Sequence, residues 1–440
     1  MSEALKFTAR SVDPGLLTLP WSTPLAEWPS STIVYLPKGI SRHLVRFANL
    51  SGRVVAIKET TEAMARREYD MLGNLARLDS PCVERVAVVA GREDASGEPL
   101  PAALVTAHLR FSLPYRALFT HVLRPDTATR LVDALAVLLV RLHNVGFFWG
   151  DVSLSNTLFR RSAGAFAAYL VDAETGELHE SGLTRGQREH DLDVARTNIA
   201  GEIMDLEAGG RLEGGVDALA IADGIVSSYR SLWGALTDQE TFSPSESWRI
   251  TERVRRLNEM GFDIGEMSIE AAMDGTRVSI QPKVVDAGHH QRRMLRLTGL
   301  DVEENQARRL LNDLDEYRAR RAKDDEDEEM VAHEWLTRVF EPVVRSIPWD
   351  LRSKLEPAEV FHQVLEHRWY MSQATERSVP LAEVLTSYID GVLRHRRDEA
   401  IVMGPLTEAM TLPIRIHDGS LDEQDDEDDE SDSVDWRDLV

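Results

Sequence analysis

The sequence predicts an α+β protein in which a small, mainly β lobe precedes a helical lobe and a further helical region. Between residues 31 and 108, β-branched runs alternate with turn residues around a single helical pattern. After Pro114, apolar residues recur at helical spacing, and this character continues to about residue 397. The sequence therefore predicts a lobe of strands, then a lobe of helices, and finally a mainly α-helical C-terminal region.

The small lobe, residues 31–108, is expected to be a strand meander interrupted by one helix. The predicted strands are Ile33–Leu36, Leu44–Phe47, Val54–Ile57, Val83–Ala90 and Ala102–Ala107. The helix covers roughly Thr61 to Leu78, because Ala65, Tyr69, Leu72 and Leu75 share one helical face. Residues 1–30 are expected to form an extended leader, since four prolines discourage a helix there.

The helical part is predicted in two sections. Residues 109–234 contain an apolar helix at Asp126–Val145 and two more at 187–206 and 213–234. Residues 235–410 are read as a mainly helical domain, interrupted by the short strand-like run Val278–Pro282 and closing with helices over 330–397. Its large apolar residues are expected in the core: Trp335, Phe340, Trp349, Phe361, Leu365 and Trp369.

Composition restricts the class of protein. The 440 residues are 43% hydrophobic and 28% charged, as in soluble globular proteins. The lone Cys82 excludes an intramolecular disulfide, and no apolar run reaches the ~20 residues that span a bilayer. The N-terminus lacks a signal-peptide pattern. These observations predict a cytoplasmic protein without a membrane span.

Charge is distributed unevenly along the chain. The formal net charge of −24 makes nucleic-acid binding an unlikely function. Residues 418–440 hold twelve acids and one arginine, and this acidic tail is expected to be disordered. The tail ends in the apolar-containing stretch Val434–Val440, which suggests a protein-docking motif as an alternative to plain disorder.

A set of polar residues has the spacing of a phosphoryl-transfer site. Asp151 and Asn156 lie five residues apart, Asp172 follows sixteen residues later, and Lys58 ends a β-branched run. Phosphoryl transfer requires a cation on the phosphates, carboxylates for metal ions and a group that orients the acceptor. Each residue alone is typical of a turn or a sheet edge, but the joint order predicts an ATP- and Mg²⁺-dependent site.

Each residue of the set has an expected role. Asp151 would orient or deprotonate an acceptor hydroxyl, whereas Asn156 and Asp172 would hold Mg²⁺. Lys58 would contact the phosphates, and Glu68 on the next helix would orient Lys58. Alone, Glu68 would be a solvated helix residue, and Glu62 is a weaker alternative. The adenine is expected near Leu104–Leu109, the connection between the two lobes.

With these motifs, the chain resembles the kinase-like superfamily over roughly residues 30–230. The matching elements are Val55–Lys58, the Gly150–Asn156 loop and the later Asp172. The resemblance is to the small atypical branch with lipopolysaccharide kinases and RIO-type kinases. Leu36–His43, Leu113–Arg116, Phe148–Arg160 and Pro282–His290 are also similar to bacterial proteins known only for a C-terminal domain of unknown function. The resemblance implies a bilobal protein-kinase-like fold and leaves the acceptor open, with a sugar or glycan-type hydroxyl as one possibility.

Several departures from the usual kinase pattern refine this expectation. The nucleotide-covering loop has only Gly39, so Ser41, Arg42 or His43 are expected to contact phosphate. Trp149 and Gly150 replace the histidine and arginine that usually precede the catalytic aspartate, and Glu174 is a candidate second metal ligand. No long activation segment follows, which argues against a phosphorylation-controlled protein kinase. The segment Arg188–Asp193 resembles a short helix in which an aspartate is structural.

Three alternatives remain open at this stage. The chain could be a pseudokinase that binds nucleotide or acts as a scaffold, with a protein partner on its C-terminal region or tail. The basic cluster Gly288–Arg293 with Arg296 could bind an anion or nucleic acid, although docking against nearby acids is the simpler explanation. Glu359 and His362 have the spacing of a di-iron helix, but the further ligands of such a site are not evident.

Overall fold

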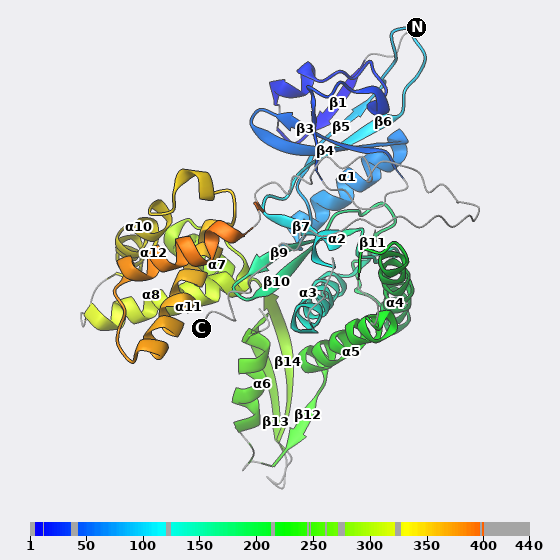
Figure 1. Ribbon diagram of the computed structural model, residues 1–440. Coiled ribbons are helices and arrows are strands. Elements are labelled where there is room, and N and C mark those ends of the chain that lie inside the picture. The colour runs from blue at the N-terminus through cyan, green and yellow to red at the C-terminus, as the bar shows by residue number, and fades with distance from the viewer. Residues whose placement is uncertain are drawn as a thin grey trace, which may run out of the picture.

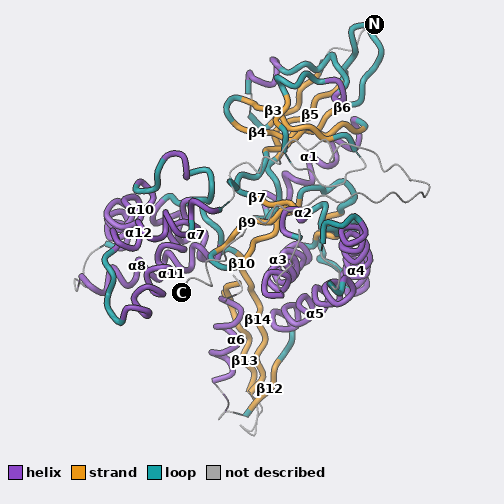
Figure 2. The backbone as a smooth tube through the Cα atoms, in the orientation of Figure 1, coloured by secondary structure: helices purple, strands orange, loops and turns teal. Residues whose placement is uncertain are grey.

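The computed structural model describes most of the chain up to residue 399. The described residues are 5–11, 13–36, 43–119, 125–212, 216–243, 246, 248–259, 262–271, 278–321, 327–396 and 398–399. Gly39, Ser41, Arg42 and the acidic tail, 418–440, lie outside these ranges. The described chain mixes sheets and helices, with the largest sheet in its N-terminal part and helices in its C-terminal part (Figures 1 and 2).

The N-terminal sheet has six strands in the order β1-β5-β6-β4-β3-β2, all of them antiparallel to their neighbours. The strands are β1 (Lys6–Ala9), β2 (Ile33–Val34), β3 (Val45–Leu50), β4 (Arg53–Thr60), β5 (Arg85–Ala90) and β6 (Ala102–Ala107). Helix α1 (Glu62–Arg77) begins at Thr61, whose hydroxyl accepts a hydrogen bond from the Met64 N–H. Its residues Ala65 and Tyr69 pack against β5 and β6.

The prediction of an extended leader over residues 1–30 is wrong for much of that segment. Besides β1 it forms two short 3₁₀ helices, Pro14–Thr18 and Leu25–Glu27. Five of its apolar side chains are buried against the sheet: Leu16, Leu19, Trp21, Leu25 and Trp28. The buried Arg92 guanidinium also donates to the carbonyl oxygens of Trp21 and Thr23. Burial of these apolar side chains and the hydrogen bonds of Arg92 hold the segment against the sheet. Its prolines do not prevent this, because proline is compatible with 3₁₀ turns.

A helical layer follows the sheet in the chain. Its helices are α2 (Tyr115–Leu118), α3 (Pro125–Asn144), α4 (Arg185–Ala208) and α5 (Ala218–Thr237). Short strands lie beside them: β7 (Ser112–Pro114), β8 (Phe147–Phe148), β9 (Thr157–Ser162), β10 (Ala165–Leu170) and β11 (Glu177–Leu178). Strands β9 and β10 form a hairpin, and β9 also pairs with β7. One apolar core joins α3, α4 and α5 to this hairpin.

Residues after 237 are less helical than predicted. A three-stranded sheet is formed by β12 (Glu240–Phe242), β13 (Phe262–Ala271) and β14 (Val278–Ala287), with β14 in the middle. The strand predicted at 278–282 is therefore β14, which is twice as long as predicted. Helix α6 (Trp248–Glu259) lies beside this sheet (Figure 1). Strand β13 is not predicted from the sequence, because residues 262–271 fall within the stretch that is expected to be mainly helical.

The last region is helical and has its own core. It contains α7 (His289–Thr298), α8 (Glu304–Arg321), α9 (Glu328–Trp335), a π-helical turn (Leu336–Phe340), α10 (Glu341–Arg345), α11 (Pro357–Thr375) and α12 (Leu381–Gly391), with 3₁₀ turns at Trp349–Leu351 and Leu393–His395. Trp335, Phe340 and Phe361 are buried there, but Trp349 is 84% exposed and Trp369 58% exposed, so their predicted core positions are wrong. Among the described residues, no helix has the length and apolarity needed to cross a bilayer.

Candidate functional site

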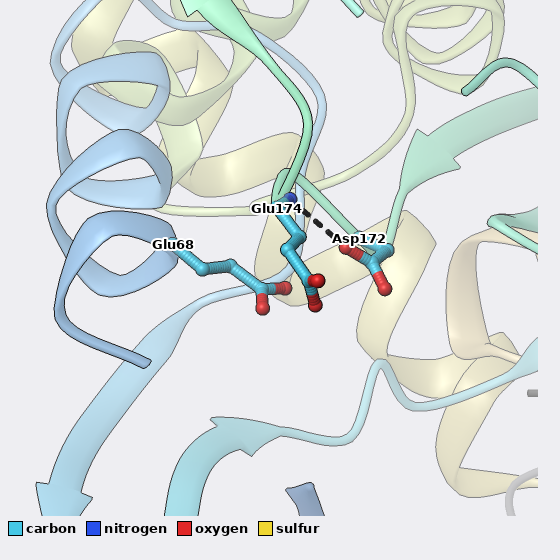
Figure 3. Close-up of side chains that lie close together, drawn as sticks. All are labelled: Glu68, Asp172 and Glu174. Carbon is cyan, nitrogen blue, oxygen red and sulfur yellow. Dashed lines mark hydrogen bonds between the residues drawn. The ribbon is translucent and has the colours of Figure 1, made fainter. Parts of the chain in front are cut away.

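Lys58 lies at the centre of a buried group of charges. It sits on β4, opposite Val45 of β3 and Leu104 of β6, and its residue surface is only 8% exposed. Its Nζ lies 3.0 Å from Glu68 Oε2, 2.7 Å from Asp172 Oδ2 and 2.8 Å from Glu174 Oε2. Figure 3 shows the three carboxylates converging from α1 and from the loop that follows β10. The structure therefore brings together four of the predicted site residues.

The electrostatics of this group depend on burial and on the excess of acids. Burial alone would lower the pKa of Lys58, but the charges of Glu68 and Asp172 raise it above its usual value. Burial and, second to it, the negative charge of Asp172 together raise the pKa of Glu68 to about 7, against the opposing effect of Lys58. One ammonium faces three carboxylates, so the group carries an excess of negative charge that an additional cation would offset.

The Asp151–Asn156 loop is held in a defined conformation. The Asn156 side-chain amide donates to the Asp151 carbonyl oxygen at 3.0 Å and to Asp151 Oδ2 at 3.1 Å. Gly150 has φ +76°, and a Cβ at this position would approach the Phe148 ring to 3.2 Å. Glycine thus permits a backbone conformation that most residues avoid. Both the Gly150 N–H and the Trp149 N–H then point toward one acceptor on α4.

That acceptor, Asp191, belongs to a polar stripe on α4 that supports the loop from below. Asp191 is fully buried and accepts hydrogen bonds from the N–H groups of Trp149 and Gly150, each at 2.7 Å. Asn198 donates to Asp151 Oδ1 at 3.4 Å and to the Val152 carbonyl oxygen at 3.1 Å. Glu202 accepts from the Leu154 N–H at 2.7 Å and the Ser155 N–H at 2.9 Å.

A structural aspartate within Arg188–Asp193 is predicted from the sequence, whereas the roles of Asn198 and Glu202 are not. The signal was present, because positions 191, 198 and 202 follow the seven- and four-residue spacing of one helix face. In an ordinary amphipathic helix a polar stripe of this kind faces solvent, so the pattern alone does not indicate burial.

Three hydrogen bonds connect this loop to the segment that carries Asp172 and Glu174. Trp149 Nε1 donates to the Asp172 carbonyl oxygen at 2.9 Å, and Thr175 Oγ1 donates to the Trp149 carbonyl oxygen at 2.8 Å. The Val171 N–H donates to the Asn156 carbonyl oxygen at 3.0 Å. The predicted catalytic and metal-binding residues therefore belong to one hydrogen-bonded unit.

A cavity of about 150 Å³ lies next to Lys58. Its lining combines apolar residues with site residues: Leu36, Val45, Ala56, Leu104, Leu109, Leu154, Leu158 and Val171 with Lys58, Glu68, Asn156 and Asp172. Thr106, Ala107 and His108, in the predicted connection between the lobes, also line it. A mostly apolar hollow that ends at charged groups is the usual form of a small-molecule site.

The residues present suit a hard cation such as Mg²⁺. Oxygen atoms of Glu68, Asp172 and Glu174 lie within 4.8 Å of one another. Because the Asn156 amide nitrogen donates to Asp151, its oxygen remains available as a ligand atom. All three carboxylates contact Lys58, but Glu68 is buried, whereas Asp172 and Glu174 are partly exposed. Carboxylate and amide oxygens are preferred ligands of Mg²⁺, and Asp172, Glu174 and Asn156 are the better-suited donors here.

Other predicted residues are placed as follows. His43 lies beside Glu174, with 3.7 Å between Nδ1 and Oε2. Glu62 pairs with Arg66 on the surface of α1 and does not approach Lys58. In the basic cluster, His290 contacts Glu304 at 2.6 Å and Arg293 contacts Glu328 at 2.6 Å. These pairs favour docking against neighbouring acids over a nucleic-acid surface.

Comparison with known proteins gives a partial match. A family model described as "Domain of unknown function (DUF4032)" matches residues 231–393, less than half of the chain. None of the curated proteins matches. Among solved structures, the chain is similar to "WaaP in complex with acyl carrier protein", with 13% identity and a TM-score of 0.32. That alignment covers 58% of this chain and 99% of the other.

Proposed function

We propose that this protein is an ATP- and Mg²⁺-dependent phosphotransferase with a bilobal kinase-like fold. The small lobe would comprise residues 31–108 and the helical lobe residues 109–234. The observation that carries the proposal is the ion-pair group at Lys58, which connects α1 to Asp172 beside the Asp151–Asn156 loop. Lysine, glutamate and aspartate from three distant segments meet at the end of an apolar cavity.

The geometry suggests a role for each group. The adenine would occupy the cavity near Leu104–Leu109, and Lys58 at its charged end would contact the phosphates. Asp172, Asn156 and Glu174 would hold Mg²⁺, which supplies positive charge against the phosphate oxygens when bound. Asp151, kept in place by Asn156 and Asn198, would orient the acceptor hydroxyl and take its proton. The acceptor class is left open by the sequence resemblance, with a sugar or glycan-type hydroxyl as one possibility.

The proposal is tested by calorimetric titration of the full chain with ATP and Mg²⁺. We expect Asp172→Asn to weaken Mg²⁺-dependent ATP binding at least tenfold, because it removes a metal carboxylate. Asp151→Asn should retain ATP binding and lose phosphoryl transfer. Asp193→Asn, an exposed aspartate on α4, serves as the charge-matched control for both. A folded protein that binds no ATP in the presence of Mg²⁺ would refute the proposal.

A second candidate, a nucleotide-binding pseudokinase, is favoured by the position of Glu174. This carboxylate adds a third acid to Lys58, so that entering phosphates would compete with it as well as with Asp172. Such a protein would act through a partner bound to its C-terminal region. The Asp151→Asn variant separates the two candidates, because a pseudokinase keeps its cellular phenotype when Asp151 is changed and an enzyme does not.

A further inference from the structure

A second cavity, of about 810 Å³, lies between the tip of the β9–β10 hairpin and the C-terminal helices. Its lining comes from the hairpin, including Arg161, Gly164 and Phe166, from α2 and α3, and from α8, α11 and α12. No described residue lines both this cavity and the one beside Lys58. It is therefore separate from the proposed phosphotransferase site, and its volume falls within the range of small-molecule sites.

The described lining of this cavity is strongly basic. It contains five arginines, namely Arg130, Arg161, Arg308, Arg309 and Arg396, against two acids, Glu359 and Glu366. Glu359 accepts hydrogen bonds from uncharged donors, the Ala163 N–H at 3.0 Å and the side-chain amides of Gln306 and Gln363. Within the part of the chain that the structure describes, Arg161 alone among the five has a close carboxylate partner, with 3.0 Å from Nε to each Glu399 oxygen.

Arg308 and Arg396 are the most informative of these side chains. The Nε atom of each is buried without a hydrogen-bond partner, and neither guanidinium makes an ion pair within the described residues. Burial lowers the pKa of Arg396, and the positive charge of Arg161 lowers it further, against the opposing charges of Glu399 and Glu359. A guanidinium group that lacks a hydrogen-bonded carboxylate in a partly dehydrated cavity costs free energy. In a chain with 74 acids and 50 basic residues, this arrangement is not explained by a shortage of partners.

We propose that this cavity binds a small molecule that carries phosphate groups. The planar guanidinium group matches a phosphate through paired N–H donors, which makes arginine the preferred residue for this ligand. Arg308 and Arg396 would contact the phosphate inside the cavity. Arg130 and Arg309, which are exposed, would add positive charge at its opening. Phe166 and Tyr370 offer aromatic surface for the remainder of the ligand.

The test is calorimetric titration of the full chain with inorganic pyrophosphate. We expect the Arg308→Gln/Arg396→Gln double variant to bind pyrophosphate at least tenfold more weakly than the unchanged chain. The charge-matched control is Arg338→Gln/Arg345→Gln, whose side chains are 70% and 75% exposed away from the cavity. The control should bind within twofold of the unchanged chain. Equal binding by the cavity variant, or no binding by the folded chain, overturns the proposal.

Further titrations show which of the two cavities binds pyrophosphate. Lys58→Met should retain the pyrophosphate site that the cavity variant loses, whereas the reverse pattern would place pyrophosphate at Lys58 and overturn the proposal. ATP binding with Mg²⁺ should survive in the cavity variant, so this inference and the proposed phosphotransferase can fail independently. Binding that appears only after deletion of residues 418–440 would assign the cavity to carboxylates of the chain itself, which also overturns the proposal.

The Arg308→Gln/Arg396→Gln variant is expected to fold, and circular dichroism melting verifies this for it and for Lys58→Met. Neither Arg308 nor Arg396 donates a side-chain hydrogen bond to a described residue, so glutamine removes no such contact. If the double variant is unfolded, the exposed pair Arg130→Gln/Arg309→Gln replaces it. That pair should weaken pyrophosphate binding at least threefold at low salt through lost charge at the opening, and unchanged binding would count against the site.

Discussion

The buried carboxylate of Asp191 should control the stability of the candidate catalytic loop. Asp191 is fully buried and accepts two backbone hydrogen bonds of 2.7 Å, from Trp149 and Gly150. Its Oδ2 also lies 3.2 Å from Nε2 of His143, whose pKa is lowered by burial, so a neutral imidazole with the proton on Nε2 fits this contact. The substitution Asp191→Asn preserves the volume and removes both the charge and one acceptor oxygen.

The expected cost follows from these contacts. The asparagine amide group has one oxygen, so its NH₂ must face one of the two backbone N–H groups. A hydrogen bond to a charged group contributes about 1.5–3 kcal/mol, and a buried donor left without an acceptor costs about 1–3 kcal/mol. Because these two estimates describe overlapping effects, we expect Asp191→Asn to reduce the free energy of unfolding by about 3 kcal/mol.

Two measurements check this value. Urea denaturation followed by circular dichroism gives the change in unfolding free energy, and hydrogen exchange reports the amides of Trp149 and Gly150 directly. At 1.36 kcal/mol per factor of ten, the protection of these amides should fall roughly a hundredfold. The control is Asp193→Asn, an exposed neighbour on the same helix, which should change stability by no more than about 0.5 kcal/mol. A loss below about 1 kcal/mol for Asp191→Asn would refute the reasoning.

Three further predictions concern the same region. Lys58→Met should lower the free energy of unfolding, measured by urea denaturation, by about 3–5 kcal/mol, because Glu68 is 1% exposed and loses its cation. Adding Glu68→Gln to this variant should recover part of that loss. Gly150→Ala should lower the free energy of unfolding by about 1–2 kcal/mol, because Gly150 has φ +76°. Gly201→Ala should instead raise it by about 0.5–1 kcal/mol, because Gly201 lies in the middle of α4 with open space around it. Equal effects of the two substitutions would contradict this. Burial lowers the pKa of His108 to about 4 in the folded chain, from about 6.5 in the unfolded chain. As the pH falls from 6.5 to 5, the unfolded chain is therefore protonated while the folded chain is not, and about 2 kcal/mol of the free energy of unfolding should be lost. In His108→Gln that loss should shrink, as urea denaturation at both pH values would show.

Local pattern was sufficient to predict much of the secondary structure. Helix α1 was expected at roughly 61–78 and covers Glu62–Arg77, and α3 was expected at 126–145 and covers Pro125–Asn144. Both have continuous apolar faces, which periodicity detects well. The N-terminal segment was missed because it is held by partners distant in the sequence, Arg92 and the sheet. Strand β13 was missed because its pairing with the next strand, β14, defines it more clearly than its own residue pattern does.

The candidate site was predictable only where chemistry and spacing coincide. Lys58, Glu68, Asp172 and Glu174 are all predicted from the sequence, and the structure brings these four residues together. Sequence spacing did not reveal that Glu174 also contacts Lys58, because that contact depends on the path of the loop after β10. The arginines around the second cavity come from α3, β9, α8 and the turn after α12, and no local pattern joins residues so far apart in the chain.

The β9–β10 hairpin explains why the C-terminal helices matter to the candidate site. Its base is adjacent to Asn156 on one strand and to Asp172 on the other. Further along, Arg160 contacts Glu303 at 2.9 Å and Glu356 at 2.5 Å, and the Ala163 N–H at the tip donates to Glu359. The hairpin is thus anchored at both ends, and its paired strands resist bending because their hydrogen bonds run along its whole length. A change in how the C-terminal helices hold the tip should therefore move the base of the hairpin as one unit, together with Asn156 and Asp172, so these helices form part of the structural support of the site.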